Sequence, residues 1–190
     1  MATTILRPSS TTSQTGWASS NIHTIIGDND SSTTVTQSAT TCNFTGLLDD
    51  LAGGLSDAAI NSFTMSLEGV AGRAGAATVS FALSHSSDGA FATENESFTG
   101  TSSTQTTSAR TTQQDGSSAL TFAYINACSI KITPNNQGIT VKELYVTVDY
   151  TPAAVVAMAK VSGVTDSNIA KVDGVTNANM AKIIGITDTD

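Results

Sequence analysis

Short runs of alternating apolar and polar residues predict β-strands in the middle of the chain. Residues 63–67 and 79–83 place apolar side chains at every second position, with hydroxyl-bearing or small residues between them. A period of two is expected of a strand that packs one face on a core and turns the other to water. Gly69, Gly72 and Gly75 lie between the two runs, and this spacing favours a hairpin that joins them.

The strongest strand pattern covers residues 139–150, and its phase slips once. Ile139 and Val141 share one phase, whereas the apolar residues from Leu144 to Tyr150 share the other. We expect a β-bulge at Lys142-Glu143, because a bulge inserts one residue and re-aims a strand without ending it. The segment before this strand, residues 134–138, contains Pro, Asn and Gly and predicts a turn.

Weaker patterns fill the rest of the first 151 residues. Residues 21–26 predict a strand, and residues 33–41 predict a Thr-rich edge strand. Apolar residues alternate with other residues again at Leu120, Phe122 and Tyr124, and then at Ile130 and Ile132, which predicts strands over residues 120–132. Leucines in residues 47–55 have near-helical spacing that Gly53-Gly54 interrupts, which indicates a short helical turn or an apolar loop. Residues 97–112 fit either edge strands or a mobile loop, and we favour strands because Thr dominates and Pro is absent.

Composition supports an all-β chain. The sequence holds 24 Ser and 31 Thr, whereas only 13% of its residues are charged. Thr is β-branched and suits a pleated surface that meets water. With no helix long enough for a βαβ unit, the pattern predicts an antiparallel jelly-roll-like β-sandwich over residues 1–151. Residues 152–190 would form a separate C-terminal tail.

The tail repeats with an 11-residue period. Its units are Lys160–Ala170, Lys171–Ala181 and Lys182–Asp190, with Lys, Gly and Thr at matching positions. Thr165 or Asp166 is suited to cap a helix start and Gly174 to end it, so we expect a short helical-turn repeat. The apolar positions would form one partner-binding stripe. The stripe comprises Met158, Ile169, Val172, Val175, Met180, Ile183 and Ile186.

The repeat resembles the Lys-Val-x-Gly-Val-x-x-x-x-Ile-Ala repeats that end many phage virion proteins, especially those of marine and cyanobacterial phages. The body resembles a β-sandwich module that recurs in phage structural proteins, through residues 5–8 with Trp17, residues 58–63 and residues 143–151. Residues 84–118 have no counterpart in this resemblance. The resemblance implies a bacteriophage structural protein located in the virion, on a capsid or on a tail appendage.

Charge and cysteine content bear on the possible partners. The formal net charge is −8, and the eight basic residues are scattered, which argues against nucleic acid and against an anionic membrane surface. No apolar run approaches the length of a membrane span, and no signal peptide is visible. Cys42 and Cys128 lack the spacing of a zinc site. They could pair as a disulfide, but buried free thiols are favoured.

The sequence predicts no catalytic site, no cofactor and no metal centre. His85 lies beside Ser87 and Asp88, but residues adjacent in sequence do not make a catalytic triad, which depends on geometry. Residues 28–31 offer closely spaced oxygen ligands that calcium could use, yet they lack the full twelve-residue loop pattern. We therefore expect a protein that is not an enzyme.

Three functions remain open at this stage. The leading hypothesis is a capsid decoration or cement protein on the outer shell, bound to the major capsid protein, with the C-terminal repeat or the N-terminal arm running along neighbouring subunits. The second is a tail or head fibre subunit, a homo-oligomer and possibly a trimer that buries its repeats between copies. The third is a glycan-binding module of a virion appendage, in which the sandwich surface recognises saccharides.

Overall fold

A computed structural model of the chain describes residues 1–72, 76–135, 138–153, 171–172 and 175–176. The chain divides into two compact units, Met1–Pro152 and Ala153–Asp190, and each is considered by itself. Within the described residues, no helix is long and apolar enough to cross a membrane.

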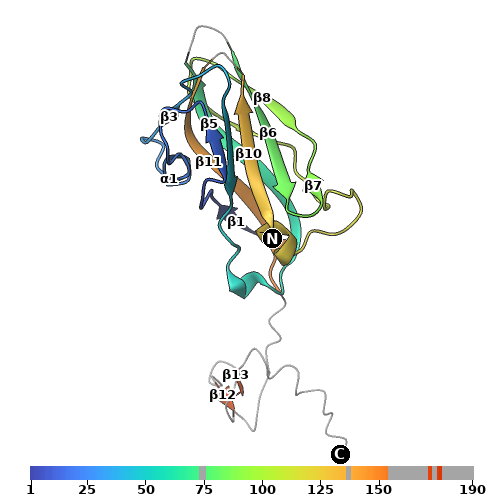
Figure 1. Cartoon of the computed structure of the whole chain (residues 1–190). Helices are drawn as coiled ribbons and strands as arrows, with labels where there is room; N and C mark the ends of the chain where they lie inside the picture. Colours follow the sequence, from blue (N-terminus) through green and yellow to red (C-terminus); the bar gives the residue numbers. More distant parts are fainter. Residues whose placement is uncertain (73–75, 136–137, 154–170, 173–174, 177–190) are drawn as a thin grey trace, which may run out of the picture. The chain divides into compact units, whose positions relative to one another are not determined.

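The first unit is a sandwich of two antiparallel sheets (Figure 1). The first sheet has the order β1-β11-β5-β9, with β3 also paired to β11. Its strands are β1 (Ala2–Leu6), β3 (Val35–Thr36), β5 (Ala59–Ala71), β9 (Ser103–Thr106) and β11 (Ile139–Thr151). The second sheet has the order β2-β4-β10-β6-β7, with β8 also paired to β6. Its strands are β2 (Ser13–Thr15), β4 (Asn43–Leu47), β6 (Ala77–His85), β7 (Gly89–Ala90), β8 (Glu94–Phe98) and β10 (Cys128–Pro134).

The predicted antiparallel β-sandwich is confirmed, and the core lies between the two sheets. Alternate residues of the long strands are buried, so that one face of each sheet is apolar and the other carries hydroxyls. The fully buried side chains include Phe44, Phe63, Phe81, Leu67, Leu83, Ile130, Ile132 and Ile139. The period of two therefore identified the core-facing side of β5, β6 and β11.

The bulge predicted in the last strand is also confirmed. Val141 pairs with Gly69 and Glu143 pairs with Glu68, so Lys142 is an extra residue without a partner of its own on β5. Val141 and Leu144 are both fully buried on either side of it. The insertion keeps both halves of β11 facing the same core, as a bulge permits.

The predicted hairpin between residues 63–67 and 79–83 is wrong. These residues belong to β5 and β6, which are both strands as predicted but lie in different sheets. β5 pairs with β11 and β9, and β6 pairs with β10, β7 and β8. The connection after Ala71 thus crosses from one layer to the other, which a local glycine pattern does not distinguish from a hairpin.

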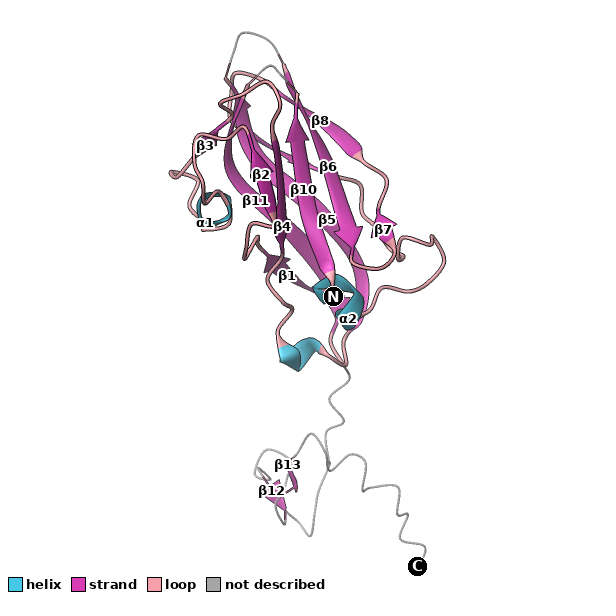
Figure 2. Ribbon diagram, in the orientation of Figure 1, coloured by secondary structure: helices cyan, strands magenta, loops and turns pink. Residues whose placement is uncertain are grey.

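Two predicted strands are short helices instead (Figure 2). Residues 21–26 contain α1 (His23–Ile26), where Ile22 and Ile26 lie four residues apart and are both fully buried. Residues 120–126 contain α2 (Phe122–Asn126), which begins because the Thr121 hydroxyl accepts a hydrogen bond from the Tyr124 amide at 3.1 Å. In both segments a single helical turn buries the apolar residues that alternation alone assigned to a strand.

The remaining weak patterns are confirmed in part. Residues 33–41 contribute only the two residues of β3, and residues 97–112 contribute the end of β8 and the four-residue β9. Residues 47–55 include a 3₁₀ turn, η1 (Gly53–Leu55), and Leu51 beside it is buried. Short edge strands of this kind expose few unpaired backbone groups.

The two cysteines are free, and the strand register keeps them apart. Phe44 of β4 pairs with Ile132 of β10, so position 42 lies level with Pro134, six residues along β10 from Cys128. At about 3.4 Å per residue the separation is roughly 20 Å, far beyond the 4–7 Å between Cα atoms that a disulfide requires. Burial raises the pKa of both thiols to about 12.

The described residues of the tail correct the helical-turn prediction. Lys171–Val172 (β12) and Val175–Thr176 (β13) form a two-residue antiparallel pair, with Val172 opposite Val175. Val and Thr are β-branched and favour extended backbone, and the Asp173-Gly174 sequence between the two strands is typical of hairpin turns. The other positions of the predicted stripe, Met158, Ile169, Met180, Ile183 and Ile186, lie outside the described residues.

A candidate ligand-binding hollow

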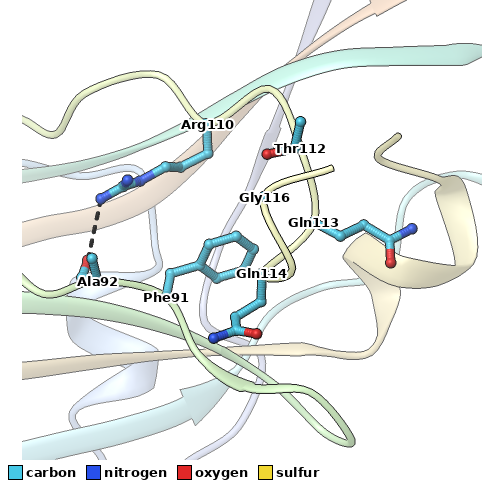
Figure 3. A pocket seen from close by; sticks show the side chains of 7 residues that line it. All are labelled: Phe91, Ala92, Arg110, Thr112, Gln113, Gln114 and Gly116. Carbon is cyan, nitrogen blue, oxygen red and sulfur yellow. Dashed lines mark hydrogen bonds between the residues drawn. The ribbon is translucent and has the colours of Figure 1, made fainter. Parts of the chain in front are cut away.

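A hollow of about 260 Å³ opens between the loop after β7 and the segment that follows β9. Figure 3 shows the Phe91 ring between the side chains of Arg110 and Gln114, whereas the amide of Gln113 points away from that ring. The lining residues are Phe91, Ala92, Arg110, Thr112, Gln113, Gln114 and Gly116.

Phe91 is held in place by a cluster of rings beneath it. Its ring meets Phe63 edge to face at a centroid distance of 5.2 Å and Tyr124 at 6.3 Å. His85 stacks on Tyr124 with centroids 4.0 Å apart. Such aromatic pairs add specific orientation to apolar burial. Because only 8% of Phe91 is exposed, the hollow presents the rim of a rigid ring.

Arg110 forms the polar wall and is fixed at both its backbone and its side chain. Its N–H and C=O both bond to Phe63 of β5, at 2.9 and 3.0 Å. Nη2 of the guanidinium donates to the Ala92 carbonyl at 3.2 Å and to Oε1 of Glu94 at 2.6 Å. Nε and Nη1 make no hydrogen bond to the described residues. They therefore remain available as donors.

The opposite wall is a loop that its own side chains hold closed. Thr112 and Ala119 form an isolated β-bridge, and Asp115 between them accepts hydrogen bonds from the amides of Ser117 and Ser118 at 2.9 and 2.8 Å. A hydrogen bond from the Ser118 hydroxyl, together with these two backbone bonds, lowers the pKa of Asp115 to about 2. Gly116 has a φ of +74°, which the loop requires.

Gln114 connects this loop to the ring cluster. Its backbone amide donates to the Tyr124 hydroxyl at 3.1 Å, and its side-chain amide reaches the Ala90 carbonyl at 3.5 Å. Gln113 instead donates to the Ala119 carbonyl at 2.7 Å. The rigid ring, the guanidinium and the Gln114 amide thus meet around one small space.

This arrangement is suited to binding rather than to catalysis. Among the described residues that line the hollow, none carries a carboxylate, an imidazole or a thiol that could act as a general acid, base or nucleophile. A hollow with one apolar surface and a few fixed polar groups is typical of small-molecule sites.

The residues around His85 do not form a catalytic triad. The Ser87 hydroxyl lies 3.2 Å and an Asp88 oxygen 3.3 Å from the same ring atom, Nδ1. A triad requires the serine at one imidazole nitrogen and the carboxylate at the other, so that the ring can relay a proton. The contacts among His85, Ser87 and Asp88 are therefore local contacts within one loop.

The oxygen-rich loop at residues 28–31 is closed by internal hydrogen bonds. Asp28 accepts from the amide of Asp30 at 2.9 Å and from the Thr33 hydroxyl at 2.6 Å, and Asp30 accepts from the amide of Ser32 at 2.9 Å. Within the described part of the chain, no group of three or more His, Cys, Asp or Glu side chains is arranged to hold a metal ion.

Charged side chains on the outer face of the first sheet pair with one another. Arg7 lies 5.4 Å above the Tyr145 ring and 3.6 Å from Glu143, and Lys142 lies 3.2 Å from Glu68. The Ser31 hydroxyl also donates a hydrogen bond to Glu68 at 2.8 Å. The face therefore carries paired charges of both signs rather than an open patch of one sign.

Pattern analysis of the sequence did not find the hollow. Phe91 and Arg110 lie in a Ser/Thr-rich stretch without periodicity and nineteen residues apart. The only signals were two isolated phenylalanines, Phe91 and Phe98, and one isolated cation within that stretch. Of the predicted stripe in the tail, Val172 and Val175 lie in the described strand pair of β12 and β13.

Comparison with protein families found no matching family model, and no characterised protein matches by sequence. Among solved structures, the C-terminal CBM6 of LamC, a marine laminarinase from Zobellia galactanivorans, aligns with a TM-score of 0.43 and 10% identity, over 77% of this chain and 98% of that one. A structure described as CBM4 aligns with a TM-score of 0.36 and 13% identity, over 62% of this chain and 72% of that one. An arabinose-bound α-L-arabinofuranosidase aligns with a TM-score of 0.38 and 10% identity, over 60% of this chain but only 19% of the enzyme. Likeness at this level carries no functional argument.

Proposed function

We propose that this chain is a non-catalytic phage virion protein whose sandwich binds saccharides through the hollow at Phe91 and Arg110. The observation that carries the proposal is the meeting of a rigid aromatic rim with fixed donors and acceptors in one small space. A sugar ring has a C–H face that packs on aromatic surface and a rim of hydroxyls that needs polar partners. The exposed part of Phe91 offers a small apolar contact for the first, and the side chains of Arg110 and Gln114 offer polar partners for the second.

The size of the hollow suits one sugar residue. At about 260 Å³ it lies just below the ~300–1,000 Å³ of sites for drug-sized ligands. A hexose has about 12 non-hydrogen atoms, and about 0.3 kcal/mol per atom gives about −3.6 kcal/mol. That free energy corresponds to a Kd of about 2 mM. Useful affinity would then come from several copies acting together, as on a virion surface.

Titration of the full chain with single sugars tests the proposal. Amide resonances of Phe91, Arg110 and Gln114 should shift together in heteronuclear NMR spectra, with millimolar midpoints. Gln114→Ala removes one polar group from the rim and should weaken binding about two- to tenfold, the worth of one hydrogen bond. Gln105→Ala, a matched change on β9 in the first sheet, should leave the midpoint unchanged. Absence of shifts across a broad sugar panel would refute saccharide binding at the hollow.

A second candidate is capsid decoration, and the observation that favours it is the 11-residue repeat of the tail. A protein that binds only the assembled shell stabilises it by mass action. Quantitative mass spectrometry of purified particles distinguishes the two roles, since decoration requires hundreds of copies and an appendage requires tens. Light scattering on the full chain and on residues 1–152 then tests the fibre alternative. A trimer that becomes monomeric on truncation would indicate that the repeats join the copies.

A further inference from the structure

We infer that the hollow selects neutral saccharides over acidic ones, because Arg110, the only cation among the described residues of its lining, is already bound by Glu94. This inference rests on the proposed saccharide function and specifies its ligand class. An arginine in a binding site ordinarily suggests an anionic ligand, since the guanidinium matches a carboxylate with two parallel hydrogen bonds. The contacts of Arg110 lead to the opposite expectation.

The geometry removes both two-pronged faces of the guanidinium. Each such face uses Nη2 together with either Nη1 or Nε. Nη2 is the atom that donates to Glu94 at 2.6 Å and to the Ala92 carbonyl at 3.2 Å. A carboxylate on a ligand would have to displace either Glu94 or the Ala92 carbonyl from Nη2 to bind with two bonds. A single hydroxyl oxygen can still accept from Nη1 or Nε.

Glu94 is itself held in place, so it does not yield readily. Its Oε1 takes the Arg110 bond and its Oε2 accepts from the Ser108 amide at 2.8 Å. The side chains of Arg110 and Glu94 are 31% and 22% exposed, so water screens their attraction only partly. Removing Glu94 from this position would leave the Ser108 amide without its acceptor.

The surrounding charge disfavours anions as well. Glu94 balances Arg110, and Asp115 in the loop of the opposite wall adds a further negative charge at neutral pH. The chain as a whole carries a formal charge of −8. An acidic sugar would approach a site whose local charge is negative, whereas a neutral sugar loses nothing to repulsion.

The test compares hexoses with the hexuronic acids of the same stereochemistry, glucose with glucuronate and galactose with galacturonate. NMR titrations of the full chain at constant ionic strength give the midpoint for each sugar. The wild-type protein should bind the neutral member at least about tenfold more tightly. Glu94→Gln frees the charge of Arg110 and should shift the ratio of the two midpoints toward the acid by about tenfold. Glu96→Gln removes the same charge two residues further along β8, on the same side of the strand as Glu94, and should leave the ratio unchanged.

Each outcome separates the inference from the proposed function. Equal or tighter binding of the uronate by the wild-type protein would refute the neutral preference while supporting saccharide binding. An equal shift of the ratio in both variants would show that overall charge, and not the Glu94–Arg110 pair, sets the preference. Failure of both sugar classes to move the Phe91 and Arg110 signals would instead refute the proposed function. The wild-type ratio needs no variant, so the test survives poor folding of Glu94→Gln.

Discussion

Deletion of Lys142 should be tolerated, although a one-residue deletion inside a central strand normally is not. Lys142 is the residue that β11 inserts between the Val141–Gly69 and Glu143–Glu68 pairs. Removing it joins two segments that already face the same core, so the ladder becomes regular and no side chain changes face.

The magnitude follows from what the deletion removes. The deletion removes one ion pair, in which Nζ of Lys142 lies 3.2 Å from Oε1 of Glu68. Both side chains are about a quarter exposed or less. A pair of this kind contributes about 0–1 kcal/mol. For a chain of this length, 1 kcal/mol lowers the Tm by about 2–4 °C. Lys142→Ala isolates the ion pair, so the deletion should cost little more than this substitution.

Deletion of Thr147 from the same strand is the contrasting control. Thr147 is a regular ladder position between Val146 and Val148, both of which are buried. Without it, Val148 turns outward and Asp149 turns inward. Exposing apolar side chains costs about 1.5–3 kcal/mol each, and burying a carboxylate costs more. The sum reaches the ~5–15 kcal/mol that stabilises a whole domain, so this variant should not fold.

Thermal and urea denaturation followed by circular dichroism measure all three variants. The expected order of stability is wild type, then Lys142→Ala and the Lys142 deletion close together, with the Thr147 deletion unfolded. If the Lys142 deletion were as damaging as the Thr147 deletion, the bulge would not be the insertion that the register indicates. A Lys142 deletion far less stable than Lys142→Ala would show that the bulge itself contributes to folding.

Three further predictions concern other parts of the sandwich. Cys42 and Cys128, with pKa values raised to about 12 by burial, should resist alkylation at pH 8 in the native protein and react only in denaturant; fast labelling without denaturant would contradict their burial. Gly16→Ala should lower the free energy of unfolding, measured in urea, by more than about 2 kcal/mol, because φ is +75° and the new Cβ would lie 2.2 Å from a backbone oxygen. Gly116 has a similar φ of +74° but no atom near the new Cβ, so Gly116→Ala should cost only the backbone strain of about 1–2 kcal/mol. Asp115 has a pKa lowered from 3.8 to about 2 in the folded protein, so its contribution to loop order is fully present above pH 4 and is lost as the pH falls through 2. The amide resonances of Ser117 and Ser118, which donate to Asp115, should shift in NMR spectra over that pH range. Asp115→Asn should abolish the transition.

Local patterns predicted the strands well where one face of a strand is buried. Alternation identified β5, β6 and β11, and a slip of one position in the alternation located the bulge at Lys142. The same reasoning failed for α1 and α2, where two or three apolar residues fit a strand and a single helical turn equally well. The Thr121 cap was present in the sequence, but a cap is informative only when a helix is already considered.

The sequence by itself determined the class of the fold, because a period of two and a surface of Ser and Thr leave little choice but antiparallel sheets packed on each other. Only the tertiary structure decided which strands are neighbours, since pairing is non-local and a glycine-rich sequence fits a crossover between layers as well as a hairpin. The position of the hollow, like the pairing of the strands, was decided only by the tertiary structure. Phe63, Phe91 and Arg110 converge only because the backbone of Arg110 docks on β5 while its guanidinium reaches the start of β8, and contacts across that distance leave no periodic trace in the sequence.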